Sequence, residues 1–466
     1  MTRSLHALRS RVLAIGALAL AGCASMAPHY ERPAAPVADT FSEAGPVAGK
    51  SAAATDWHDF FTDARLRRLI EVALANNRDL RVAMLDVETA RAQLGLQRSA
   101  EFPSLSLAAG EDRVSGQPTV FSAGISVASW ELDLWGRVRS LTAAAAAQLA
   151  ATEEGRKAAQ ISLVASVANA DVAVRADGAQ LELARRTLAT REDTLKLTQL
   201  RFDHGVASDL DLQDARSLVE GARVAQASAR RQLLIDQDAL VLLLGQSQPA
   251  DLPAGTPWDD FDLPDVPAGL PSDVLLGRPD VRQAEHQLVA ANANIGAARA
   301  AFFPTITLTG SYGTASSQLD KLFDHRAFTF APQIVLPIFD AGRNRANLAA
   351  SEANRDIAVA QYEKAIQSAF RDVADALAGR ATLSDQLRAQ QAQADAQQHR
   401  YELTSLRFEH GVASSLELLD AQRSLFTVQQ ATVATRMALQ QNRIALYRAL
   451  GGGWTEPHAH TADARR

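Results

Sequence analysis

A sixteen-residue stretch that occurs twice constrains the fold of this 466-residue chain most strongly. The first copy spans 200–215 (LRFDHGVASDLDLQDA) and the second 406–421 (LRFEHGVASSLELLDA), a constant 206 residues later. Twelve of the sixteen positions are identical, and two more exchange Asp for Glu. Two near-identical copies so far apart indicate a duplicated architecture.

Each copy carries the signals of one helix ending and another beginning. Gly205 and Gly411 can take the left-handed conformation that commonly follows a helix. Ser208 and Ser414 can cap the next helix, each with an acidic residue three positions later. One copy alone would be typical of an ordinary turn, but the repetition makes the turn a candidate contact surface. The residues expected to meet a partner are Gly205, Val206, Ala207 and Ser208, and Gly411, Val412, Ala413 and Ser414.

The distribution of proline predicts very long helices. All seventeen prolines lie outside two runs, residues 119–248 and 338–456. The absence of the strongest helix breaker over such lengths favours continuous helices, and one over 139–203 would be about 100 Å long. Leucines and phenylalanine fall seven positions apart at 181, 188, 195 and 202, which suits a coiled-coil seam.

Four short segments alternate apolar and polar residues with period two, at 104–109, 121–128, 305–312 and 328–336. Each is about as long as a tilted strand that crosses an outer membrane. A half-buried hairpin of a soluble protein would look the same in one segment, but four of them beside such long helices favour membrane strands. Trp130 and Trp135 follow the second segment and are either membrane-interface aromatics or core residues.

Four strands cannot close a barrel, and an open sheet edge in lipid leaves backbone groups unsatisfied. The sheet must therefore be completed by other copies of the chain. Two copies give eight strands and a lumen filled by side chains, whereas three give twelve strands and room for solute. The long helices also need a wide ring, so we expect a homotrimer. The predicted fold class is a mixed α+β membrane protein with an internal two-fold repeat.

The first 22 residues read as a targeting segment. A basic start and a short apolar stretch, too short to span a bilayer, precede Leu20-Ala21-Gly22-Cys23. This is the pattern of a bacterial lipoprotein signal, in which Cys23 becomes the acylated N-terminus held in outer membrane lipid. A plain signal peptide with an incidental cysteine is the alternative. The chain has a single cysteine, placed directly after small residues, which favours lipidation and excludes an intramolecular disulfide.

The duplication extends beyond the turns, because FPSLSL at 102–107 matches FPTITL at 303–308. Each repeat therefore reads as helix, two strands and a long helical hairpin. The expected division is 1–22 signal peptide, 23–61 acylated tether, 62–248 first repeat, 249–272 proline-rich connector, 273–453 second repeat and 454–466 polar tail.

No constellation for catalysis or cofactor binding occurs in the sequence. The ten histidines contain no HExxH pattern, and no glycine-rich phosphate loop follows a strand. His458 and His460 form either a weak metal site or, as we favour, part of a solvated tail. We expect no enzyme and no cofactor, so any energy must come from a partner. The net charge of −6 gives no support for nucleic-acid binding.

These residues resemble the TolC-like outer membrane factors, specifically the NodT-type lipoprotein channels of tripartite RND efflux systems. The resemblance rests on both turns and on four further stretches, which together cover nearly the whole mature chain. The four stretches are 28–33, 57–63 (WHDFFTD), 130–137 (WELDLWGR) and 277–282 (GRPDVR).

The resemblance implies a trimer in the outer membrane of a Gram-negative bacterium. Its twelve-stranded β-barrel would continue into a barrel of long antiparallel α-helices in the periplasm. The turns would meet the hairpins of a membrane fusion (adaptor) protein, which links the channel to an inner membrane RND pump. The implied function is that of a passive exit duct for small toxic compounds or drugs.

The resemblance also implies a periplasmic gate. By position after the second turn, Leu416 and Asp420 match the constriction of the closed channel as an apolar ring and an acidic ring. One helical turn separates them, so both point the same way. The alternative is that Leu416 is a seam residue and Asp420 a solvated charge. Asp214 holds the equivalent place after the first turn and is a weaker candidate.

Two rival functions stay open on the sequence. One has the same architecture and is the exit duct of a type I protein secretion system, which the lipoprotein signal and the NodT-like stretches disfavour. The other is an acylated coiled-coil envelope scaffold without a pore, which the four alternating segments disfavour.

Overall fold

The computed structural model describes residues 25–41, 55–265 and 272–454. Cys23, His458 and His460 lie outside the described residues, so their predicted roles stay predictions. The chain divides into two compact units. The first unit is built from residues 1–36, 83–155 and 280–365, and the second from 37–82, 156–279 and 366–466.

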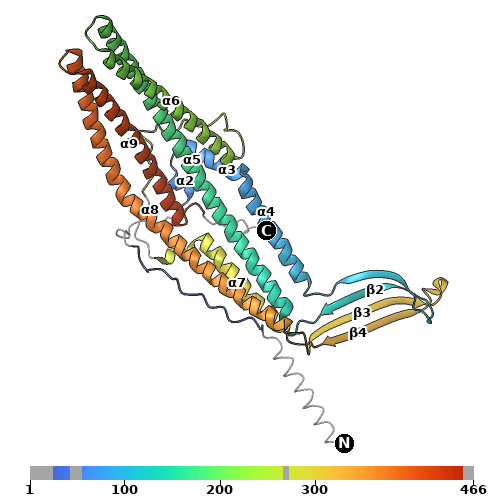
Figure 1. The fold of residues 1–466 in the computed structure, drawn as a ribbon. Coiled ribbons are helices and arrows are strands. Elements are labelled where there is room, and N and C mark those ends of the chain that lie inside the picture. Colours follow the sequence, from blue (N-terminus) through green and yellow to red (C-terminus); the bar gives the residue numbers. More distant parts are fainter. Residues whose placement is uncertain (1–24, 42–54, 266–271, 455–466) are drawn as a thin grey trace, which may run out of the picture. The chain divides into compact units, whose positions relative to one another are not determined.

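The first unit contains a four-stranded antiparallel sheet in the order β1-β2-β3-β4, visible as four adjacent arrows in Figure 1. The strands are β1 (Leu105–Asp112), β2 (Val120–Glu131), β3 (Thr305–Ser316) and β4 (Arg326–Val335). The helices α4 (Arg78–Ser99) and α7 (Pro279–Ala300) precede the two strand pairs. The four strands predicted from the alternating segments are therefore confirmed.

The strand register gives the sheet one apolar face. Residues directly opposite each other across all four strands form a row of large apolar side chains: Leu107, Ile125, Tyr312 and Phe328. These four side chains are between 52% and 85% exposed. The next row along uses Leu105, Val127, Gly310 and Phe330. An apolar face of this kind remains exposed in the single chain.

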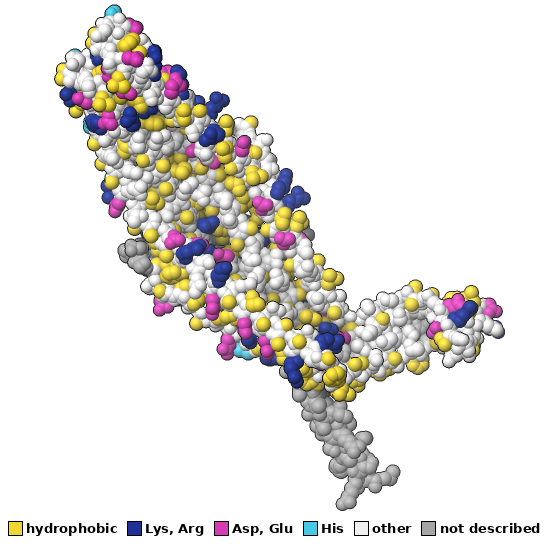
Figure 2. Space-filling view, viewed as in Figure 1, with side chains coloured by type: hydrophobic (Ala, Val, Ile, Leu, Met, Phe, Trp, Pro, Cys, Tyr) yellow, Lys and Arg dark blue, Asp and Glu magenta, His cyan; other side chains and the backbone are white. Residues whose placement is uncertain are grey.

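The opposite face carries small polar side chains, because successive residues of a strand point to opposite sides. Its clearest row is Ser106, Ser126, Ser311 and Thr329, in which the last two hydroxyls hydrogen-bond at 2.7 Å. Figure 2 shows charged side chains gathered at the end of the sheet where the turns lie, with few along its length. Charged residues at this end include Glu111, Asp112, Arg113, Asp320, Lys321 and Asp324.

The end of β2 is shaped by local packing. A β-bulge between Val127 and Trp130 places Ser129 at φ 49°. Trp135 donates its indole N–H to the Pro304 carbonyl at 2.8 Å and stacks on Phe303 at 4.8 Å between ring centres. These contacts favour the core interpretation for Trp135. For Trp130 the choice between membrane interface and core stays open.

Two helices of 67 residues, α5 (Arg137–Asp203) and α8 (Arg343–Glu409), follow the two strand pairs. Each turns back into a shorter helix, α6 (Asp209–Leu244) or α9 (Ser415–Ala449). The proline-free runs therefore predicted the long helices correctly, and 67 residues correspond to about 100 Å. Among the described residues, no helix combines the length and apolar character that crossing a membrane requires.

The second unit begins with α2 (Trp57–Phe60) and α3 (Ala64–Asn76). Asn77 has an extended backbone and caps α4, because its side-chain oxygen accepts from the Leu80 N–H at 2.9 Å. Gly245 ends α6 at φ 68° and lies so close to Asn76 that a Cβ would be 2.4 Å from its carbonyl oxygen. Only glycine fits there.

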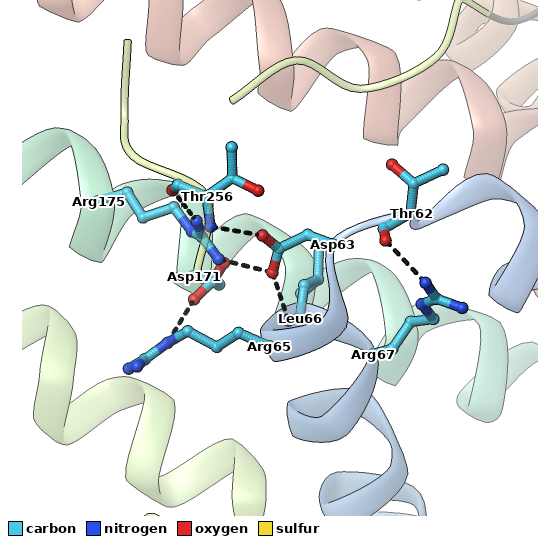
Figure 3. A network of polar contacts seen from close by, with 8 residues as sticks. All are labelled: Thr62, Asp63, Arg65, Leu66, Arg67, Asp171, Arg175 and Thr256. Carbon is cyan, nitrogen blue, oxygen red and sulfur yellow. Dashed lines mark hydrogen bonds and ion pairs between the residues drawn. The ribbon is translucent and has the colours of Figure 1, made fainter. Parts of the chain in front are cut away.

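A buried polar network attaches the connector and α3 to α5 (Figure 3). The Asp63 carboxylate accepts from the backbone N–H of Leu66 at 2.8 Å and of Thr256 at 2.9 Å. It also accepts from Arg175 at 2.9 Å, and the same guanidinium donates to Asp171 at 2.6 Å. One carboxylate thus caps a helix and holds a loop from the middle of the chain.

The aromatic stretch 57–63 packs on the end of α9 in the second unit. Phe60 stacks on Tyr447 with ring centres 4.0 Å apart, and the Tyr447 hydroxyl donates to the Thr55 carbonyl at 2.8 Å. Burial and the nearby Asp56 and Asp59 carboxylates raise the pKa of Tyr447 above its ordinary value. The hydroxyl therefore stays protonated and able to donate.

Candidate functional site

The two hairpin turns, called here the first tip (residues 204–208) and the second tip (residues 410–414), have the same backbone. Gly205 and Gly411 adopt φ of 72° and 73°. The backbone N–H groups of Val206 and Val412 donate back to the last helical turn at 2.8 Å in each case. The predicted left-handed glycines are confirmed.

The helix that follows each tip begins with a serine cap, as predicted. The Ser208 hydroxyl accepts from the Asp211 N–H at 3.2 Å, and Ser414 accepts from the Glu417 N–H at the same distance. In the first tip, Asp211 also accepts from the Ser208 N–H at 3.0 Å, which completes a capping box. Hydrogen bonds from Ser208 lower the pKa of Asp211, so this carboxylate stays charged. Each cap stabilises its hairpin by about 1 kcal/mol.

The tips expose apolar side chains at matching positions. Val206 is 76% exposed and Val412 68%. At the second position of the helices that follow, Leu210 and Leu416 are also exposed. Ala413 of the second tip is only 9% exposed, so most of its surface packs within the turn.

The two hairpins contact each other next to the tips, and the equivalent phenylalanines of the two repeats are buried to different extents. Arg201 of the first hairpin donates to the Phe408 carbonyl at 2.9 Å, and its guanidinium lies 4.1 Å from the centre of the Phe408 ring. Phe408 is 4% exposed and packs with Ala413 and Leu418 of its own hairpin. The equivalent residue of the first repeat, Phe202, is 36% exposed. The two repeats therefore have the same backbone conformation at this point, but their side chains pack differently.

A groove of about 520 Å³ lies where the two tips meet. Its walls include Val206 and Ala207 from the first tip and Gly411, Ala413 and Ser414 from the second. Five of the eight predicted contact residues thus line one groove, which has both apolar and charged walls.

The proposed gate residues lie just beyond the tips. Leu416 is exposed at the start of α9, and Asp214 is exposed on α6. Asp420 accepts a hydrogen bond from Arg400 of α8 at 2.6 Å. Arg400 was not among the residues predicted from the sequence. Its signal was spacing, because residues 400 and 420 are equally far from His410 and positions equidistant from a hairpin turn lie opposite each other.

The tips can therefore serve as a binding surface for another protein. The tips present exposed valines, capped helices and a groove, and the described residues place no group of three or more His, Cys, Asp or Glu side chains where they would hold a metal ion.

Comparison with known proteins agrees with this picture. The outer membrane efflux protein family matches residues 69–246 and 270–452. The chain is 45% identical to the probable efflux pump outer membrane protein TtgC of Pseudomonas putida, over 98% of this chain and 97% of that protein. It is 46% identical to the outer membrane protein OprJ of Pseudomonas aeruginosa, over 96% and 98%.

Solved structures show the same fold. A membrane protein from Pseudomonas aeruginosa has a TM-score of 0.87 and 44% identity, covering 94% of this chain and 100% of that one. The open state of the Neisseria gonorrhoeae MtrE outer membrane channel has a TM-score of 0.85 and 41% identity, covering 92% and 98%.

Sheet, hairpins and relatives together define an outer membrane channel protein. The chain belongs to the outer membrane efflux protein family. It is the outer membrane component of an efflux pump in a Gram-negative bacterium, as the resemblance implied.

Proposed function

We propose that three copies of this chain form the passive exit duct of a tripartite RND efflux pump, leading from the periplasm to the exterior. The observation that carries the proposal is the two-faced sheet. Its exposed apolar rows suit lipid, and its rows of Ser, Thr, Gly and Ala suit a water-filled lumen.

The edges of the sheet support a trimer. β1 and β4 each have one paired side, so one edge of each is free to pair with another copy. Three copies close twelve strands into a barrel wide enough for solute, continuous with the long helices. Native mass measurement in detergent tests this: a trimer is expected, and a stable monomer or dimer would contradict it.

The tips are the proposed docking surface for the hairpins of a periplasmic adaptor protein. Exposed Val206 and Val412 and the groove between the tips offer apolar contacts with a charged rim. Replacing both valines with Asp should abolish adaptor cross-linking and leave the trimer intact. Replacing exposed Val224, far from the tips on α6, gives the matched control.

The gate proposal rests on Leu416 and Asp420, with Asp214 as a further acidic candidate. Three copies of Asp420 about one axis would attract cations and repel anions, and three copies of Leu416 would resist wetting. The Arg400 pair adds a second role for Asp420, since it joins α8 to α9.

We expect Leu416→Ala with Asp420→Ala to raise basal conductance in planar bilayers and to reduce cation selectivity. Asp214→Ala should have a smaller effect. Arg400→Gln separates the two roles of Asp420, because it breaks the ion pair and keeps the acidic ring. If the double variant conducts and selects like the parent, the constriction lies elsewhere on the helices.

The exported compounds are proposed to be small toxic organics. Relatives are named for efflux of toluene, solvents and antibiotics. These names favour efflux over type I protein secretion, and conductance would exclude the poreless scaffold. Genomic neighbours that encode an adaptor and an RND pump would test the assignment most directly.

We also propose that Cys23 is lipidated. Its position after Leu20-Ala21-Gly22 supports this, and Cys23→Ala should leave the precursor without acyl chains. Labelled fatty acid on the variant protein would refute the proposal.

A further inference from the structure

A pocket of about 280 Å³ lies between the helical hairpins of the second unit, away from the tips. α5 supplies Leu183 and Arg191, α8 supplies Tyr401, and α9 supplies Gln422 and Phe426. The pocket therefore has walls from both repeats. Its volume lies just below the usual range of about 300–1,000 Å³ for ligand pockets, so only a small molecule fits.

Arg191 is a buried cation that faces this pocket. Its side chain belongs to a residue only 5% exposed, and one guanidinium nitrogen, Nη1, donates to the Leu218 carbonyl at 3.0 Å. Its Nε is buried and has no hydrogen-bond partner among the described residues. Burial, together with the neighbouring charge of Arg423, lowers the pKa of Arg191. An arginine nevertheless stays protonated in proteins.

No carboxylate of the described chain forms an ion pair with Arg191. The adjacent acid, Glu192, pairs instead with Arg223 at 3.0 Å. At the rim, Arg186 is paired with Glu182 at 3.1 Å. A buried charge without a counter-charge destabilises the fold. An anion that binds in the pocket would offset this cost by pairing with Arg191.

The rest of the pocket suits the body of an organic molecule. The Arg191 guanidinium lies 5.2 Å from the centre of the Phe426 ring, and Leu183, Leu425 and Tyr401 add apolar wall. Gln422 is 5% exposed and donates to the Thr194 hydroxyl at 2.9 Å. Its carbonyl oxygen Oε1 is buried and has no hydrogen-bond partner among the described residues.

We propose that this pocket binds one small organic carboxylate per chain, with the carboxylate on Arg191 and an aromatic or aliphatic body against Phe426 and Leu425. The ligand would contact α5, α8 and α9 together, so binding should also stabilise the packing of the first hairpin on the second.

The internal repeat offers a comparison within the molecule. Position 397, which is 206 residues after Arg191, holds glutamine, and position 220, the counterpart of Phe426, holds glutamate. Both the cation and the aromatic wall are thus missing at the equivalent place. The site belongs to one face of the chain and is not a general property of the hairpins.

Isothermal titration calorimetry on the full-length protein in detergent tests the proposal with benzoate as the probe. Benzamide has the same ring without the negative charge, so it tests whether the charge of the ligand is needed. Acetate and chloride are anions without a ring, so they test whether the apolar body of the ligand is needed. Arg191→Gln copies the residue of the second repeat, and Arg191→Lys keeps the charge without the planar fork. Arg423→Gln removes a neighbouring exposed cation and is the matched control.

Benzoate should bind once per chain, and Arg191→Gln should weaken it about tenfold or more, as expected for a charge-assisted hydrogen bond. Arg191→Lys should be intermediate, and Arg423→Gln, which leaves Arg191 in place, should weaken binding far less than Arg191→Gln does. Benzoate should raise the melting temperature of the parent and not of Arg191→Gln. The proposal is overturned if the parent does not bind benzoate, if benzamide or chloride binds equally well, or if Arg191→Gln binds like the parent.

Discussion

At the scale of single residues, burial and pairing decide which charges hold the second unit together. Burial on its own would raise the pKa of Asp63, but hydrogen bonds from Thr256 and Leu66 and the charge of Arg175 bring it below its ordinary value. Burial raises the pKa of Asp171 despite the same arginine. Both carboxylates contact Arg175, and the one that also accepts two backbone hydrogen bonds is the stronger acid.

Asp177 of α5 is a half-buried carboxylate, and it faces another acid. Burial, together with a hydrogen bond to Asp236 and its charge, raises the pKa of Asp177 to about 7. Because the folded-state pKa lies above the unfolded value, stability is full below about pH 4 and falls as pH rises through 7. Asp177→Asn should therefore raise the melting temperature at pH 8 and change it little at pH 4.5. An equal shift at both values would contradict this origin.

Replacing a tip glycine with alanine should lower the stability of the protein, whereas the same replacement of a helical glycine should raise it. Gly205 has φ 72° and no atom within 4 Å of a built Cβ, so Gly205→Ala costs only backbone strain, about 1 kcal/mol. Gly178, within α5, is equally unobstructed but helical. Gly178→Ala should stabilise by about 0.8 kcal/mol. Denaturant or thermal unfolding of both variants, with Gly411→Ala as a repeat of the first, measures the contrast.

At the scale of elements, the sequence predicted much of the fold because its signals are local. Missing proline marked α5 and α8, and period-two alternation marked the strands. Serine caps and glycines marked the tips. Each of these features depends on the preferences of a few neighbouring residues.

Contacts between residues far apart in the chain could not be predicted from the sequence. Arg175 reaches Asp63, 112 residues away, and Arg201 of the first hairpin reaches Phe408 of the second, 207 residues away, and no local pattern encodes either contact. In the sequence Arg191 looks like an ordinary exposed helix cation, and only the structure shows that it is buried and that its Nε has no hydrogen-bond partner among the described residues. The unequal burial of Phe202 and Phe408 was likewise hidden, because their sequence surroundings are nearly identical.

At the scale of the whole molecule, the duplicated chain builds one sheet from two halves. β2 of the first repeat pairs with β3 of the second, and Gly124 and Gly313 let the strands approach where a Cβ would lie 2.5 Å or less from the partner backbone. Closing three such sheets into one barrel would turn every apolar row toward lipid and every small polar row toward the lumen.

Two neighbouring residues of β4 test that assignment of faces. Phe330 belongs to the apolar row with Leu105 and Val127, and Thr329 belongs to the polar row with Ser311. Phe330→Lys would place a charge against hydrocarbon and should destabilise the barrel by about 2–4 kcal/mol near the bilayer midplane. Thr329→Lys would place the same charge in water, so the trimer should form normally and pass fewer cations. Heat resistance of the trimer and reversal potential in bilayers measure the two effects. If Thr329→Lys prevents assembly and Phe330→Lys does not, the faces are reversed and the sheet does not close as proposed.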